Sequence, residues 1–455
     1  MEIFQVDKQC PEQALHFARV EGSARRSQWR VALLSMLFVC GFGVVVSPQV
    51  QLDVCGCKNN PGSLGDFNTL DPATYPPGTI SAFRVLTIPL PPDGVLVFNS
   101  MNLQLRPADG GFLPITFTRN AANTPVTLLV SGNVTLAQSV TMNISADPIV
   151  QASVNVLGKG SLGGPGGFRG GDGGYQLVNF ARMGGAGSGP GGGIGGNDHY
   201  YANGHAANAT FVGAADLLPL IGGSGGGGGG SATGAAGCGG GGGGGGGGAL
   251  LIAADGTITI NGQIIADGAS GGNYGGDPSC SSNGGGGAGG AVRLLATTLT
   301  GSGNVFARGG SSGLGPVANG SVRMEALNNN MTVGQTTPLA TRAAGPGPIV
   351  NPITPTVAIT TVGGQAVPSP PGGGAGAIDL VLLAPGQTPV AFTTSGVPTG
   401  TLVDVTVKPR VGGLPVTTPV TLGNCSANGV CLESVTFDLP AGAYFLEARA
   451  TFTRP

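Results

Sequence analysis

The residues of this chain that could do chemistry are few, and the best candidates stand in one short stretch. Asp198 and His199 are adjacent, and His205 follows six residues after His199. A carboxylate with two imidazoles could bind a metal ion or support acid–base catalysis near neutral pH. No third well-spaced ligand is visible, so a loop without a site is the competing interpretation.

Acidic residues near the strand-rich repeats are the second candidate set. A carbohydrate-cleaving enzyme needs carboxylates that converge on one face, and the nearest acids here are Asp255, Asp267 and Asp277. Asp255 and Asp267 stand at expected turns, where aspartate is favoured for backbone reasons. A Gly-Gly-Asp-Gly-Gly motif around Asp172 hints at a calcium-binding repeat, but such sites need stacked copies. No catalytic residue and no cofactor is therefore expected.

The N-terminal region predicts export. Basic residues ending at Arg30 precede an apolar run from Val31 to Val46, which is typical of an export signal or a short signal anchor. A buried core helix is less favoured, because no partner helix follows. Cys55 and Cys57 come next; they could pair with each other or with another chain, and a zinc site is disfavoured because no further ligand lies near them.

The 8 cysteines fit the oxidising compartment that export implies. Cys425 and Cys431 flank an Asn-Gly turn signal, which predicts a hairpin closed by a disulfide. Cys238 and Cys280 stand in consecutive glycine-rich loops and could form a second disulfide.

Composition excludes several classes of protein. Hydrophobic residues make up 40% of the 455 residues, enough for a core, whereas charged residues make up only 9%. The net charge of -2 gives no basic surface for nucleic acid. The 89 glycines concentrate in the middle of the chain and include ten in a row at residues 239–248.

Internal repeats predict the fold. Residues 249–268 match residues 291–309 with one deletion, so that Ile264 aligns with Val305. A looser copy covers residues 126–146, and a fourth begins at Ser321. Each copy holds about three short strands with Gly, Asn or Asp between them, which is typical of one coil of a right-handed parallel β-helix.

Glycine-rich sequence follows successive repeats, so these insertions should leave the same corner and lie on one flank. The first, at residues 148–248, is expected to include a strand pair at residues 175–180. Side-chain-free runs could pack as extended helices bonded through their backbones, or they could stay solvated because glycine loses much entropy on ordering. We expect ordered bases and mobile tips.

The fold class expected is all-β, with four regions. Residues 1–57 form the export segment and a Cys-rich junction, and residues 58–336 the glycine-rich parallel β-helix. Residues 337–356, rich in Pro, Gly, Thr and Ala, form a linker. Residues 357–455 hold strands separated by Pro/Gly turns, which fits an Ig-like β-sandwich, although a jelly roll would show the same pattern.

Residues 163–171 and 289–296, with their Gly-Gly-Pro-Gly-Gly-Phe-Arg-Gly-Gly and Gly-Gly-Ala-Val-Arg-Leu-Leu-Ala sequences, resemble glycine-rich exported bacterial proteins. The resemblance covers roughly residues 80–330 and implies a β-solenoid surface or matrix protein, with no catalytic motif to transfer. The C-terminal region is similar to Ig-like accessory modules of bacterial surface proteins.

The preferred hypothesis is an exported, non-catalytic structural or adhesion protein, extracellular or at the cell surface, which residues 31–46 could anchor in the membrane. Cell-surface polysaccharide or protein is the expected partner, and nucleic acid is not. The alternative is a carbohydrate-active β-helix enzyme of the lyase or hydrolase type. A third hypothesis is an ice- or surface-binding protein with threonine ladders such as Thr257 and Thr259, which lacks a regular repeat of the motif.

Overall fold

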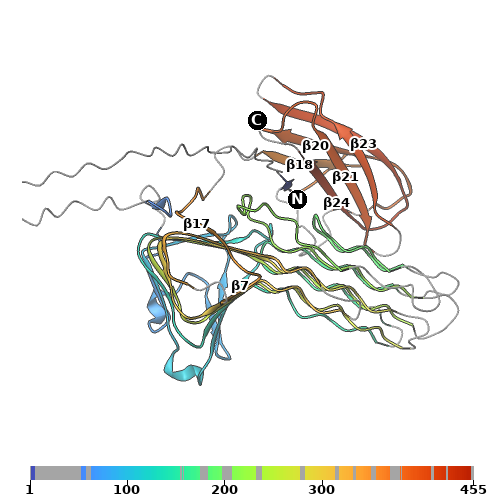
Figure 1. Ribbon diagram of the computed structural model, residues 1–455. Coiled ribbons are helices and arrows are strands. Elements are labelled where there is room, and N and C mark those ends of the chain that lie inside the picture. The colour runs from blue at the N-terminus through green and yellow to red at the C-terminus, as the bar shows by residue number, and fades with distance from the viewer. Residues whose placement is uncertain are drawn as a thin grey trace, which may run out of the picture.

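The regular structure of this chain is nearly all β-strand (Figure 1). Besides the strands, the described residues include two complete short 3-10 helices, η2 (Pro72–Thr74) and η3 (Pro107–Asp109). None of their helices is long and apolar enough to cross a membrane. The computed structural model describes residues 2–5, 53–57, 63–153, 156, 158–174, 183–196, 208–231, 238–276, 282–312, 317–331, 335–349, 355–368, 380, 382–410, 414–426 and 429–451.

Two large sheets are built almost entirely from parallel strand pairs; the β3–β4 pair is antiparallel. The first sheet has seven strands in the spatial order β16-β14-β12-β10-β7-β4-β3. Its strands are β3 (Ile80–Ala82), β4 (Val85–Pro89), β7 (Leu113–Thr118), β10 (Val140–Asn143), β12 (Gln263–Ile265), β14 (Asn304–Phe306) and β16 (Thr336–Thr337).

The second sheet has nine strands, seven of which follow the order β17-β15-β13-β11-β9-β6-β2, while β8 pairs with both β5 and β11. Its strands are β2 (Asp66–Asn68), β5 (Val95–Phe98), β6 (Ser100–Leu103), β8 (Val126–Val130), β9 (Val134–Leu136), β11 (Ala249–Ile260), β13 (Ala291–Thr300), β15 (Ser321–Asn329) and β17 (Thr341–Ala343).

The strand register confirms the repeat alignment. Ile252 lies opposite both Leu128 and Leu294, and Ile264 lies opposite Val305. The pairing of β11 with β13 shifts by one residue after Ala254, where the sequence alignment required its deletion. Each matched segment is therefore a neighbour of its copy in the same sheet.

The expectation of three strands in every repeat is wrong for the later copies. The copy at residues 126–146 does hold three, β8, β9 and β10. In the next two copies the first two strands merge into one long strand, β11 or β13, because β11 pairs with β8 over its first part and with β9 over its second. The repeats thus contribute to two sheets rather than three.

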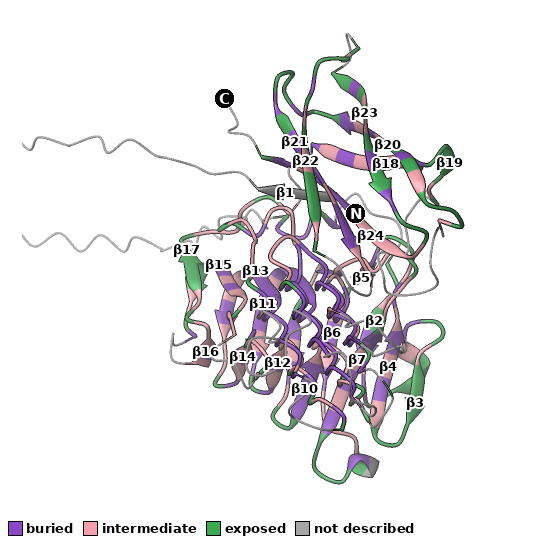
Figure 2. Cartoon of the chain, turned by 90° about the vertical axis from the view of Figure 1, so that its right-hand side faces the viewer, coloured by how far each residue is buried: buried purple, intermediate pink, exposed green. Residues whose placement is uncertain are grey.

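Aliphatic side chains from both parallel sheets form one core. Strands such as β4 and β7 alternate buried and half-buried residues (Figure 2). Leu86, Ile88 and Ile115 are therefore on the face that points into the core. Equivalent positions in successive repeats stack, as Leu128, Ile252 and Leu294 do in neighbouring strands. This stacking keeps the strands in register.

The glycine-rich insertions leave the parallel sheets at one corner. They begin directly after β10, β12 and β14 of the first sheet and end directly before β11, β13 and β15 of the second. Figure 1 shows the extended segments side by side, reaching away from the sheets. We call their described residues the glycine bundle, which comprises residues 158–174, 183–196, 221–231, 238–248, 266–276, 282–290 and 307–312.

The C-terminal region forms two four-stranded sheets, ordered β19-β18-β20-β23 and β1-β24-β21-β22. Val390 and Phe392 from one sheet and Val405 from the other share a separate core cluster. The N-terminal strand β1 pairs with β24 in parallel. The strands are β1 (Glu2–Gln5), β18 (Thr356–Val362), β19 (Gln365–Ala366), β20 (Gly386–Ser395), β21 (Leu402–Pro409), β22 (Val416–Thr421), β23 (Val430–Leu439) and β24 (Tyr444–Thr451).

The range expected to be a linker, residues 337–356, still contributes to the parallel sheets. β17 lies within it and pairs with β15. Further along, Gly347 donates its N–H to Glu325 Oε2 at 2.7 Å, and Arg293 Nη1 donates to the Pro348 carbonyl at 2.9 Å. These contacts hold residues 347–348 against the second sheet.

Candidate functional site

The Asp-His candidates Asp198, His199 and His205 lie outside the described residues, as do the strand pair expected at residues 175–180 and the apolar run from Val31 to Val46. Their assignments stay predictions. The same holds for Asp277 and Cys280.

The structure places two of the expected cysteine pairs. Cys425 and Cys431 form a disulfide with an S–S distance of 2.03 Å, which confirms the predicted hairpin closure. Gly429 has a φ of 73° in that hairpin, a left-handed conformation that favours glycine. Cys55 and Cys57 pair with each other. Cys238 is disulfide-bonded.

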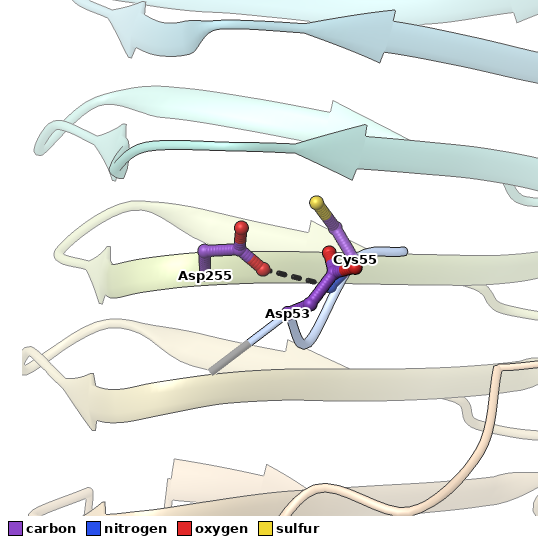
Figure 3. A group of neighbouring side chains, drawn as sticks. All are labelled: Asp53, Cys55 and Asp255. Atoms are coloured by element: carbon purple, nitrogen blue, oxygen red, sulfur yellow. Dashed lines mark hydrogen bonds between the residues drawn. The ribbon is translucent and has the colours of Figure 1, made fainter. Parts of the chain in front are cut away.

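One group of side chains has the spacing of a metal site. Ligand atoms of Asp53, Cys55 and Asp255 lie within 4.8 Å of one another (Figure 3). The Cys55 sulfur is part of the disulfide with Cys57, however, so it is not a thiolate. Asp255 Oδ1 accepts a hydrogen bond of 2.9 Å from the Cys55 N–H. The carboxylate of Asp255 thus fastens residues 53–57 onto β11.

The two described acids among those named for an enzyme, Asp255 and Asp267, belong to different sheets. Asp255 lies in β11 of the second sheet, whereas Asp267 follows β12 of the first. Asp267 Oδ2 forms an ion pair of 2.5 Å with Arg308, whose guanidinium also lies 4.4 Å from the Phe306 ring centroid. The hydrogen bonds that Arg308 donates to Asp267 raise the pKa of Arg308, although burial acts against it. This pair joins two neighbouring repeats.

Threonines do form a register column on the second sheet. Thr259 of β11 lies opposite Thr135 and Thr300, and the same column continues through Asn102 to Asn68. Thr257 lies opposite Thr298, and that position in β15 is Asn328. The columns are mixed Thr and Asn positions rather than a regular double-threonine array.

A shallow pocket of about 530 Å³ opens at the β2 end of the parallel sheets. Tyr75, Arg106 and several prolines line it. Arg106 is already held by Asp109 at 2.7 Å and by the Ser81 hydroxyl at 2.7 Å. Burial acts to raise the pKa of Asp109, but hydrogen bonds from Arg106 outweigh it and leave that pKa below its ordinary value. The pocket's arginine is therefore a structural ion-pair partner.

A buried charge cluster on the second sheet was not anticipated from the sequence. Glu325 Oε1 accepts hydrogen bonds from Arg293 Nε at 2.8 Å and Arg323 Nε at 2.7 Å. Arg293 and Glu325 are only 2% and 1% exposed. Burial acts to raise the pKa of Glu325, but the two arginines outweigh it and lower the pKa. The only signal in the sequence was that aligned positions of β13 and β15, Arg293 and Arg323, both carry an arginine.

The central segment of the glycine bundle, residues 240–248, is hydrogen-bonded to its neighbours with a period of three residues. Positions 240, 243 and 246 donate their N–H groups to carbonyls in residues 168–174 and accept hydrogen bonds from residues 158–164. A three-residue repeat of partners is that of a polyproline II-type helix. Such a helix has no internal hydrogen bonds, so the neighbouring segments satisfy its backbone.

The other two sides of this segment are bonded in the same way. Positions 241, 244 and 247 donate to residues 282–288 and accept from residues 223–229. The carbonyls of 242 and 245 accept from residues 269–272. Five segments therefore surround residues 240–248, which confirms the packed alternative for the described part of the glycine runs.

A Cβ atom on the central segment would collide with the surrounding backbone. At Gly243 it would lie 2.0 Å from the Gly226 carbonyl oxygen, and at Gly246 it would lie 1.8 Å from that of Gly223. Close approach of backbone to backbone thus requires glycine on every side. Residues 240–248 are buried at every position.

The C-terminal sheets contact the glycine bundle through charged side chains of β21 and the residue that follows it. Lys408 Nζ lies 2.9 Å from Glu447 Oε2, and Arg410 Nε lies 3.2 Å from Asp172 Oδ2. Asp172 also forms an ion pair with Arg169 and accepts a hydrogen bond from the backbone N–H in the neighbouring segment at residue 160. The carboxylate of Asp172, the candidate for calcium binding, is therefore engaged in ion pairs.

No family model matches the chain, and no curated protein or solved structure matches it.

Proposed function

We propose that this chain is an exported structural protein of the cell surface or extracellular matrix, with an adhesion role and without catalytic activity. The observation that carries the proposal is the glycine bundle. Its central residues, 240–248, are bonded to five neighbouring segments and have no side chains. Such an element can set shape and spacing, but it offers no group for acid–base or nucleophilic chemistry.

We propose further that the parallel sheets form a right-handed β-helix and that the C-terminal sheets form an Ig-like β-sandwich. The four repeats in parallel register support the β-helix. The single core cluster between the two C-terminal sheets supports the sandwich. Together they make a rigid spacer that ends in a separate β-domain.

The engagement of the carboxylates favours this role over a carbohydrate-active enzyme. A glycosidase needs two carboxylates on either side of the scissile bond, roughly 5–10 Å apart. Asp267 is paired with Arg308, Asp172 with Arg169, and Glu325 with Arg293. Each of these acids contributes to the fold through an arginine.

The location is tested by labelling intact cells that produce the full chain with a C-terminal tag. A membrane-impermeant amine-reactive biotin reagent should label the tagged chain without lysis. Labelling only after lysis would overturn the proposed location. A cytoplasmic protein of the same cells serves as the control for leakage.

The adhesion role is tested by deleting the gene and measuring attachment of the cells to one another and to a surface. We expect attachment to fall and to return when the full chain is restored. The enzyme alternative has a distinct readout, because purified full chain would then release reducing sugars from the cells' own polysaccharide. Such release, with unchanged attachment, would replace the proposal.

A further inference from the structure

Two charged residues on the outer face of a C-terminal sheet are buried, although that face points away from the sheet's own core. In β21, Val403, Val405 and Val407 face the core, so Lys408 faces outward. Glu447 of β24 lies opposite Thr406 and diagonal to Lys408 on the same face. Both are only 7% exposed.

The glycine bundle covers this pair. Lys408 Nζ donates to the carbonyl oxygens of Gly187 at 3.4 Å and Gly189 at 3.2 Å. The Gly189 N–H donates to Glu447 Oε1 at 2.8 Å. One ion pair therefore satisfies three backbone groups at the edge of the bundle, and buried backbone groups of this kind need partners.

A second contact lies beside the first and is selective for glycine. Arg410 Nε reaches Asp172 Oδ2, and a Cβ at Gly185 would lie 2.3 Å from the Arg410 carbonyl oxygen. Any side chain at that position would push the two surfaces apart. Gly189 has a φ of 94°, which also favours glycine.

We propose that Lys408, Arg410 and Glu447 form a binding surface for backbone presented at glycine positions, and that its partner is the bundle edge at residues 185–189 of the same chain, through Gly185, Gly187 and Gly189. The surface recognises a carbonyl, an N–H and a second carbonyl in sequence and excludes a Cβ at residue 185. It fixes the C-terminal sheets in one orientation on the bundle, so that the described parts of the parallel sheets, the bundle and the C-terminal sheets behave as one rigid body. This inference rests on the contacts alone and not on the proposed function.

The test uses small-angle X-ray scattering and limited trypsin digestion of the full chain. Lys408→Met removes the ammonium group that the C-terminal sheet donates to the bundle. Gly185→Ala changes the bundle side of the contact, where the added methyl group would collide with the Arg410 carbonyl oxygen. We expect both variants to show a larger maximum dimension than the wild type. Because Arg410 loses its contact with Asp172, cleavage after Arg410 should be roughly tenfold faster.

Two controls separate undocking from unfolding. Asp404→Asn changes an exposed residue of the same strand and should scatter as the wild type does. Gly187→Ala would place a Cβ 1.9 Å from the Gly225 carbonyl oxygen, within the bundle, and should lower the thermal stability of the bundle itself. Lys408→Met should leave that stability unchanged.

The proposal is overturned if Lys408→Met has the wild-type scattering profile and cleavage rate. It is also overturned if the wild type forms a dimer that Lys408→Met abolishes, because the surface would then bind the glycine edge of a second copy. Should Gly185→Ala fail to fold, Lys408→Met alone decides the outcome.

Discussion

At Gly244 a side chain has no room, because a Cβ would lie 2.0 Å from the Ala269 carbonyl oxygen and 2.8 Å from the Gly287 nitrogen. We expect Gly244→Ala to lower the free energy of unfolding by about 3 kcal/mol, since the surrounding backbone must shift. Gly345→Ala is the control, because its Cβ would meet Leu327 at an ordinary 3.6 Å. Denaturant titration measures both. Equal midpoints for the two variants would contradict the close packing.

The ionisation of the Glu325 carboxyl group makes the stability of the fold depend on pH. Its pKa is lowered from 4.5 in the folded chain, so its contribution is present above about pH 4.5 and is lost as the pH falls through the folded-state value. Glu325→Gln should be less stable than the wild type by about 3 kcal/mol at pH 7, because it leaves Arg293 buried without its charge partner. Its stability should also fall less on acidification than that of the wild type.

Unfolding curves from pH 7 to pH 3 test this expectation. Asp267→Asn is the matched control, since its partner Arg308 is 48% exposed and water screens the pair. A Glu325→Gln variant that matches the wild type at every pH would show that the cluster adds nothing to stability.

At the scale of elements, side-chain patterns explain which parts were predictable. The match of residues 249–254 with residues 291–296 predicted that these segments are neighbours, and they pair without a gap. Alternation of buried and polar residues could be read directly from strands such as β7. The patterns did not predict that two strands merge into β11. The residues at the register shift within that strand, Asp255 and Gly256, are typical of a turn.

The glycine bundle and its contacts were beyond sequence reasoning for a related reason. A run of identical glycines has no pattern that distinguishes one side of the segment from another, so its five neighbours could not be assigned. The docking role of Lys408 was equally hidden, because a lysine at an outward strand position normally reaches solvent. Only the structure shows that the glycine edge covers it.

The hairpin closed by Cys425 and Cys431 gives a prediction at this scale. The two residues are six apart, and a loop of that length limits the entropic gain of the disulfide to about 2 kcal/mol. Replacing both cysteines by serine should lower the free energy of unfolding by that amount. The measurement is made under oxidising conditions, so that the Cys55–Cys57 bond stays intact. An unchanged midpoint would show that strand pairing alone holds the hairpin.

At the scale of the whole molecule, the glycine bundle lies between the two largest hydrophobic cores of the described residues. One core fills the parallel sheets and the other lies between the C-terminal sheets. The glycine bundle is continuous with the first, because each insertion begins and ends at a sheet strand. It touches the second unit through the hydrogen bonds that it accepts from Lys408 and through the ion pair of Asp172 with Arg410. Backbone hydrogen bonds thus take the place of side-chain packing between the cores.

This arrangement predicts how the molecule opens. To expose the amides of residues 240–248, the chain must break hydrogen bonds to five segments, which are themselves held by β11, β13 and β15. We expect these amides to exchange with deuterium as slowly as those of β11, because exchange from a central segment requires global rather than local opening. Mass spectrometry of peptides from the deuterated protein measures both exchange rates.

The edge strand β22 is the control, because its residues are exposed or half-buried and should exchange much faster. If residues 240–248 exchanged at the rate of β22, the bundle would be opening independently of the sheets and could not serve as a rigid spacer.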